Sequence, residues 1–128
     1  SRPADSAELQ RFTEFKALVE ENFTVWHQVR HYSDAMNCSG RSVTRATTAC
    51  AGCSAKAYIS DRITLEARRL LTHTAAPVHL ISQILGFDEP THFIKFFIKN
   101  AGFSPARFRN SAARRGLSPE KAQNEVNR

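Results

Sequence analysis

The sequence predicts an all-α protein of about seven helices, in which one pair of helices occurs twice. Three observations lead to this fold class. Apolar residues recur at spacings of three and four along most of the chain, as they do in amphipathic helices. Alternation of apolar and polar residues never persists for five positions, which argues against strands. Shifted by about 50 positions, the sequence matches itself over about 30 residues.

The first helix is predicted over residues 8–26. Its apolar stripe consists of Leu9, Phe12, Phe15, Val19, Phe23 and Trp26. We assign residues 1–27 to a helix and linker that follow an upstream domain absent from this sequence. The sequence leaves open whether this segment belongs to the domain or forms a linker and dimerisation helix.

A long linker helix is predicted within residues 54–75, because Ser54 suits an N-cap and Pro77 ends the helical pattern. With about 20 residues it would be about 30 Å long. Its apolar stripe consists of Ile59, Ile63, Ala67, Leu70 and Leu71. Shorter helices are predicted over residues 28–36, 40–50, 78–85, 89–99 and 105–114. The first helical unit then covers 28–58 and the second 77–114, and residues 115–128 are a polar tail.

The internal repeat defines the two units. At a shift of 49 residues, Val29 coincides with Val78, Tyr32 with Ile81, Ser33 with Ser82, Met36 with Leu85 and Asn37 with Gly86. At a shift of 50, Val43 coincides with Phe93, Arg45 with Lys95, and the turn of residues 51–54 with that of 101–104. Asn and Gly both tolerate the left-handed conformation that ends a helix, so each copy predicts a helix, a tight turn and a helix. Two copies in matched register favour a tandem helix-turn-helix protein.

The charge of the chain is unevenly distributed. The net charge is +6, but residues 1–27 sum to −2 and residues 28–128 to +8. A basic body fits a polyanion partner, although charge alone fits a basic soluble surface equally well. No apolar run approaches the roughly 18 residues of a membrane span, so no membrane association is expected. The absence of a secretory signal and the odd number of three cysteines predict a cytoplasmic protein with free thiols.

In a helix-turn-helix protein, the second helix of each pair enters the major groove of DNA. In the first copy this helix follows Ser39, the predicted N-cap. Three of its outward residues are assigned to base reading: Arg41, Thr44 and Arg45. Arginine suits this role because its planar group can donate two hydrogen bonds to guanine. Three hydroxyl residues are assigned to phosphate contact: Ser39, Ser42 and Thr48. The alternative is an ordinary solvated helix face.

In the second copy, Asp88 or Glu89 with Pro90 is predicted to begin the corresponding helix. Thr91, Ile94 and Lys95 are assigned to base reading, and His92 and Lys99 to phosphate contact. Ile94 fits the methyl group of thymine or a neighbouring domain, and the sequence does not choose between them. For His92 a hydrogen-bonded packing role is the competing interpretation.

Three cysteines raise the question of a metal or redox site. Cys50 and Cys53 form a Cys-x-x-Cys pair, and Cys38 is nearby. Cys53 coincides with Phe103 in the repeat, where we expect a core position, and no second ligand pair completes a zinc site. Motifs that mark phosphate-binding loops, nucleophile elbows or zinc proteases are absent. We therefore expect no metal, no cofactor and no enzymatic activity.

The stretch from Val29 to Arg109 resembles the DNA-binding domain of AraC/XylS-type transcriptional regulators. The most telling segments are residues 61–71 (DRITLEARRLL), 81–93 (ISQILGFDEPTHF) and 102–109 (GFSPARFR). The resemblance implies two homeodomain-like helix-turn-helix units on one duplex, with their recognition helices in successive major grooves. It also implies an upstream effector-binding or dimerisation domain and, for activators, contact with RNA polymerase.

Departures from the family pattern lie mainly in the first unit. Thr47 stands where a large apolar residue is usual, and Asn37 and Cys38 replace a glycine and an aliphatic residue. They predict a looser core and weaker DNA binding in this unit. In the second unit, Lys95 stands where arginine is more usual. The competing function is a protein-interaction module on a degenerate helix-turn-helix scaffold, which Ile94, Ile98 and the acidic first helix would support.

Overall fold

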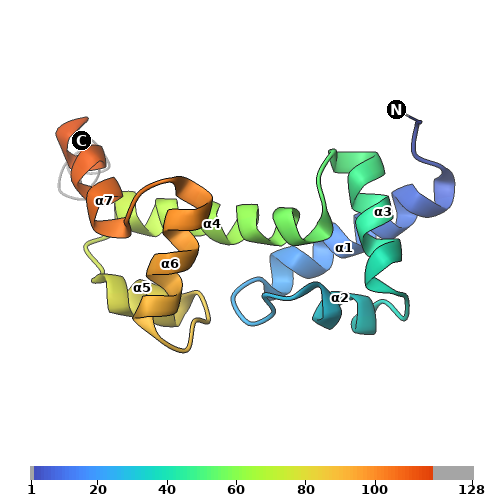
Figure 1. Ribbon diagram of the computed structural model, residues 1–128, viewed down its shortest axis with the longest axis horizontal. Helices are drawn as coiled ribbons and strands as arrows, with labels where there is room; N and C mark the ends of the chain where they lie inside the picture. The colour runs from blue at the N-terminus through green and yellow to red at the C-terminus, as the bar shows by residue number, and fades with distance from the viewer. Residues whose placement is uncertain (1, 117–128) are drawn as a thin grey trace, which may run out of the picture. The chain divides into compact units, whose positions relative to one another are not determined.

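The computed structural model describes residues 2–116, and within them the fold is all-α, as predicted (Figure 1). Its helices are α1 (Ser6–Asn22), α2 (Val29–Ala35), α3 (Gly40–Ala51), α4 (Ala55–His73), α5 (Val78–Ile84), α6 (Pro90–Ala101) and α7 (Pro105–Arg114). None of the helices in these residues is long and apolar enough to cross a membrane. Most of the predicted tail, residues 117–128, lies outside the described part of the chain.

The chain folds as two compact units that divide within α4. The first unit extends to Ile63, and the second begins at Thr64. Hence α4, predicted as a linker, contributes its first half to one unit and its second half to the other. Ser54 caps it as predicted, because its hydroxyl accepts a hydrogen bond from the N–H of Ala57 at 3.1 Å.

Helix α1 is part of the first unit, where it packs along α3 and touches α2 (Figure 1). Phe15 and Val19 are fully buried. The ring of Phe15 meets that of Tyr32 edge to face at a centroid distance of 5.4 Å. The hydroxyl of Tyr32 donates to the carbonyl of Trp26 at 2.9 Å, and burial raises the pKa of this tyrosine to about 12. Residues 6–22 therefore supply a core helix of the first unit.

The predicted end of the first helix at residue 26 was wrong. Helix α1 ends at Asn22, and the N–H groups of Val25 and Trp26 both bond to the Asn22 carbonyl in the turn that follows. Trp26 nevertheless contacts Tyr32, with ring centroids 5.4 Å apart. The apolar stripe continues past the helix because the turn folds back onto the same core, so spacing alone could not locate the helix end.

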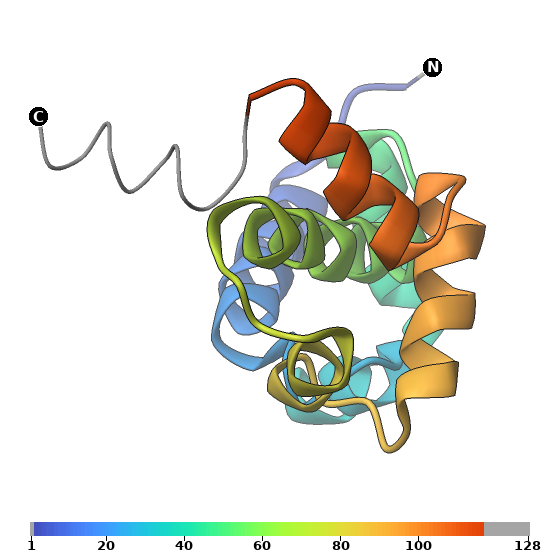
Figure 2. The same ribbon diagram turned by 90° about the vertical axis from the view of Figure 1, so that its left-hand side faces the viewer.

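The second unit has an aromatic and aliphatic core. Figure 2 shows α6 beside α5 and α7. Phe93 and Phe97 of α6 are fully buried, and Phe97 meets Phe108 of α7 with ring centroids 5.7 Å apart. The guanidinium of Arg109 donates to three carbonyl groups at the end of α4: those of Leu71 at 3.0 Å, Thr74 at 3.2 Å and Leu70 at 3.5 Å. This side chain fastens α7 to the second half of α4.

The two copies of the repeat form the same turn. In the first, the N–H of Cys38 bonds to the carbonyl of Ser33 at 3.1 Å, and in the second the N–H of Phe87 bonds to that of Ser82 at 3.0 Å. The residues before these donors, Asn37 and Gly86, have φ of 55° and 85°. Both serines are buried. The left-handed positions predicted from the sequence are thus confirmed.

Helix α4 takes part in both copies. Buried residues of α1 correspond to buried residues of α4 at a spacing of 48. Phe15 and Val19 correspond to Ile63 and Ala67, and Phe23, the C-cap of α1, corresponds to Leu71. At a spacing of 50, the buried residues that begin α4 and α7, Ala55 and Pro105, also correspond. Each unit therefore has four helical segments in the same order. The end of α4 in the second unit is equivalent to α1 in the first unit. The beginning of α4 in the first unit is equivalent to α7 in the second unit.

Candidate nucleic-acid interface

Helix α3 is fixed at both ends by residues that the sequence identified. Ser39 is the N-cap, and its hydroxyl oxygen accepts a hydrogen bond from the N–H of Ser42 at 3.1 Å. Gly52 ends the helix with φ of 76°. The buried residue Thr47 donates its hydroxyl proton to the Val43 carbonyl at 2.8 Å, so it leaves no unpaired donor in the core. Phe15 and Val19 of α1 are fully buried in the same unit and add apolar side chains to its core.

The opposite face of α3 carries the residues assigned to DNA. Arg41, Arg45 and Thr48 are exposed, and Ser42 and Thr44 are half-buried. Arg41, Thr44, Arg45 and Thr48 line one concavity. Helix α3 contains no acidic residue of its own, and its first turn carries none that would offset the positive end of its dipole. This face is therefore suited to an anion.

The three hydroxyl groups assigned to phosphate contact differ in whether their proton already forms a hydrogen bond within the protein. Ser39 donates to the hydroxyl oxygen of Ser42 at 3.0 Å, and Thr48 donates to the Cys53 carbonyl at 3.3 Å. Each hydroxyl has a single proton. Ser42 therefore keeps its own proton for an external acceptor, whereas a phosphate would have to displace the bonds that Ser39 and Thr48 make within the protein.

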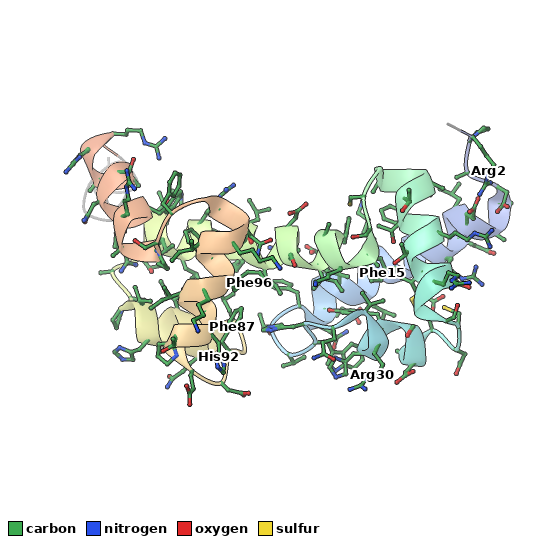
Figure 3. The ribbon with its side chains drawn as sticks, in the orientation of Figure 1. Arg2, Phe15, Arg30, Phe87, His92 and Phe96 are labelled. Atoms are coloured by element: carbon green, nitrogen blue, oxygen red, sulfur yellow. The ribbon has the colours of Figure 1, made fainter. Side chains whose placement is uncertain are left out.

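Helix α6 presents the corresponding face in the second unit. It begins at Pro90 after the N-cap Glu89, and it contains no acidic residue. The exposed residues of its outer face are Thr91, His92, Lys95 and Lys99, while Ile94 is half-buried and Ile98 is 45% exposed. Figure 3 shows His92 near the beginning of α6. Since His92 is exposed, its interpretation as a packing residue was wrong, and it remains available to a ligand.

A group of residues at the beginning of α1 was not predicted from the sequence. Glu8 is buried, and both of its carboxylate oxygens accept from the guanidinium of Arg2, at 2.8 and 2.9 Å. Glu8 and Asp5 also form a capping box, a pattern of Asp followed three residues later by Glu that was readable in the sequence. The hydrogen bonds from Arg2 and from the Asp5 backbone lower the pKa of Glu8 to about 2. Arg2, labelled in Figure 3, lines the same concavity as Arg41 and Arg45.

The cysteines are free thiols and form no site in the described structure. Burial, and then the charge of Asp61, raise the pKa of the half-buried Cys53, which makes its thiol less reactive at neutral pH. The expected core position of Phe103 was wrong, because this residue is 42% exposed and its ring stacks on that of Phe108 outside the core. Among residues 2–116, no group of three or more His, Cys, Asp or Glu side chains is placed to hold a metal ion.

Comparison with known proteins identifies the family. A model of the helix-turn-helix domain matches residues 32–111. The chain is 26% identical over 97 residues to YisR, an uncharacterized HTH-type transcriptional regulator of Bacillus subtilis (strain 168). That match covers 76% of this chain and 34% of YisR, so the chain spans about a third of the length of this relative.

Solved structures share the fold. The C-terminal domain of AraT, a response regulator from Geobacillus stearothermophilus, matches with a TM-score of 0.71 and 22% identity, over 87% of this chain and 88% of that one. The DNA-binding domain of the global transcriptional factor AdpA, solved in complex with a target DNA, matches with a TM-score of 0.71 and 23% identity, over 82% of this chain and 95% of that one. A regulator with an AraC-type DNA-binding domain from Chromobacterium violaceum matches with a TM-score of 0.69 and 21% identity, over 85% of this chain and 97% of that one.

The family match covers more than half of the chain, and it includes helices α3 to α6 and thus the turns of both copies of the repeat. It confirms the resemblance seen in the sequence. The family consists of transcription-factor domains and not of enzymes. This chain belongs to the AraC-type helix-turn-helix family of DNA-binding domains of transcriptional regulators.

Proposed function

We propose that this AraC-type domain reads specific DNA sequences through α3 and α6, each inserted in one of two successive major grooves of a duplex. In α3, Arg41, Thr44 and Arg45 contact base edges. In α6, Thr91, Ile94 and Lys95 have the same role. The domain does so in the bacterial cytoplasm as part of a longer regulator, and contact with RNA polymerase and response to an effector belong to that whole regulator.

The proposal divides the polar contacts by their function. Contacts to phosphate, from Ser39, Ser42, Thr48, His92 and Lys99, position the helices and account for most of the salt dependence of binding. Arg45 and Lys95 distinguish guanine from the other bases by donating hydrogen bonds to its O6 and N7 atoms. Ile94, which is half-buried on α6, is suited to a thymine methyl group.

One observation supports this proposal most strongly. The second helices of both copies, α3 and α6, expose basic residues at matched positions, Arg45 and Lys95, and neither helix contains an acidic residue. The same charge pattern on two helices that share their turn geometry favours one ligand, a polyanion, for both.

The proposal is tested with Arg45→Ala and Lys95→Ala in binding titrations. The probe is a duplex that the unaltered protein selects from a random pool, and Arg68→Ala, an exposed arginine of α4, is the control. Each test variant should lose about 1–3 kcal/mol of specific binding free energy and relax discrimination at one base pair. The control should stay near the unaltered protein. If neither test variant loses about 1 kcal/mol, these helices do not read bases.

The selected duplexes test the tandem geometry separately. Two half-sites centred about 10 base pairs apart are expected from helices in successive major grooves. A single half-site would show that only one unit reads sequence. If two half-sites are selected, Arg45→Ala and Lys95→Ala should each weaken binding to a different one.

A second candidate function, a protein-interaction module, is favoured by apolar residues on the surface of the second unit. Leu80 and Ile84 of α5 are 40% and 44% exposed, and Ile98 of α6 is 45% exposed. Such a module would bind a protein partner with little dependence on salt and would have no affinity for duplex DNA. A duplex titration at two salt concentrations distinguishes the two functions.

A further inference from the structure

The N-terminal segment of the first unit brings additional positive charge to the face of α3. We infer that Arg2, which Glu8 fastens beside α3, and Arg11 each bind a backbone phosphate next to the groove that α3 reads. This inference rests on the proposed function of α3. It assigns DNA contact to a part of the chain that the charge count of residues 1–27 would exclude, since that segment is acidic overall.

Two adjoining concavities place these arginines next to α3. Arg2 lines the first together with Arg41, Thr44 and Arg45. Arg2 also lines the second, where it is joined by Arg11 of α1 and by Ser42 and Arg45 of α3. Four guanidinium groups therefore border this surface, while its acidic residues are Asp5 and Glu8.

Both carboxylates are already engaged within the protein. Asp5 accepts a hydrogen bond from the N–H of Glu8 at 2.8 Å, and both oxygens of Glu8 are bonded to Arg2. The charge of Arg45 also contributes to the lowered pKa of Glu8, which places this carboxylate within electrostatic range of α3. With its carboxylates bound internally, the surface keeps a net positive charge toward a ligand.

The ion pair leaves Arg2 able to bind a second anion. A guanidinium has five N–H groups, and the two bonds to Glu8 use two of them. The side chain of Arg2 is 61% exposed and that of Glu8 is 8% exposed, so the carboxylate lies inside and the arginine outside. Because Glu8 already restricts this arginine, ordering it on a ligand costs less conformational entropy than ordering a free side chain.

A phosphate is the ligand that this geometry fits. Planar guanidinium groups bind phosphate oxygens in pairs, and the hydroxyl of Ser42 has a proton to donate on the same surface. In DNA, phosphates line the walls of the groove that α3 would enter. Contacts of this type add affinity and salt dependence without reading sequence.

The test compares Arg2→Ala and Arg11→Ala with Lys16→Ala, which removes one positive charge from an exposed position of α1 that borders neither concavity. Affinity for a duplex selected by the unaltered protein, and for a scrambled duplex of equal length, is measured from 50 to 200 mM salt. Loss of one phosphate contact lowers the slope of log affinity against log salt by about 0.9. Raising the salt concentration over this range should therefore lower the affinity of each test variant by a factor about 3.5-fold smaller than the factor for the unaltered protein.

The same measurements show what would overturn the inference. If the slopes of Arg2→Ala and Arg11→Ala equal that of Lys16→Ala, neither arginine binds phosphate. If the ratio of affinities for the selected and scrambled duplexes collapses, the arginines read bases instead. If the unaltered protein binds no duplex, the proposed function itself fails. Helix content and thermal midpoints of the variants, measured by circular dichroism, establish that altered slopes come from folded protein.

Discussion

Substitution of Phe15 by alanine tests whether α1 is part of the domain. Phe15 is fully buried in the first unit, and its ring contacts those of Tyr32 and Tyr58 at centroid distances of 5.4 and 5.5 Å. Replacing a fully buried phenylalanine by alanine typically costs about 3–5 kcal/mol. The two ring contacts belong to this cost, at about 0.5–1.5 kcal/mol each. We therefore expect a loss of about 4 kcal/mol in the free energy of unfolding of the first unit.

Phe12→Ala provides the matched control. Phe12 lies on the same helix but is only half-buried, and its ring meets that of Tyr58 at 5.6 Å. With less area removed from water and one ring contact, its loss should be about half that of Phe15→Ala. Urea denaturation followed by circular dichroism gives both free energies. Equal losses in the two variants, or a loss below about 1.5 kcal/mol for Phe15→Ala, would refute the placement of α1 in the core.

Three other predictions follow from individual side chains. Arg109→Met removes the donor that bonds to three carbonyl groups at the end of α4, and it should lower the unfolding free energy by about 2 kcal/mol in urea titrations, with Arg107→Met as an exposed control. The pKa of Glu8 is lowered from 4.5 to about 2, so the ionised carboxylate stabilises the folded chain above pH 4.5, and this contribution is lost as the pH falls toward 2. Glu8→Gln should therefore have a flatter profile of thermal midpoint against pH in that window. Asn37→Ala should cost about 1 kcal/mol because φ is 55° there, whereas Asn37→Gly should cost nothing; equal thermal midpoints for the two variants would contradict this reasoning.

Much of the fold followed from the sequence because the repeat supplies the same information twice. The positions of the two turns were readable since Asn37 and Gly86 tolerate a left-handed backbone at matched places. The caps Ser39 and Ser54 also marked their helices correctly, because a hydroxyl before an apolar stripe has a local partner in the helix itself.

Contacts that depend on the tertiary fold were not readable. The stripe through Phe23 and Trp26 looked like one helix, but the chain turns after Asn22 and still buries Phe23. Phe103 looked like a core residue because it coincides with Cys53 in the repeat, at a position expected to be apolar, yet it lies in an exposed turn. Apolarity at a given spacing reports which residues share a core but not the path of the backbone between them.

The candidate interface was predicted in part. The outward residues of α3 and α6 follow from helical periodicity, and the structure exposes Arg41, Arg45 and Lys95 as expected. Arg2 was missed because its place beside α3 depends on the packing of α1, which no local pattern encodes. The net charge of a segment conceals such a residue, since charges that are adjacent in sequence need not point to the same surface.

The double use of α4 links the folding of the two units. A helix must nucleate before it can propagate, and here one nucleation event starts a segment that both cores require. When either core forms, it holds half of this helix in place and thereby favours extension into the other half. The arrangement resembles a repeat protein in which neighbouring repeats stabilise each other, here with two repeats that share one helix.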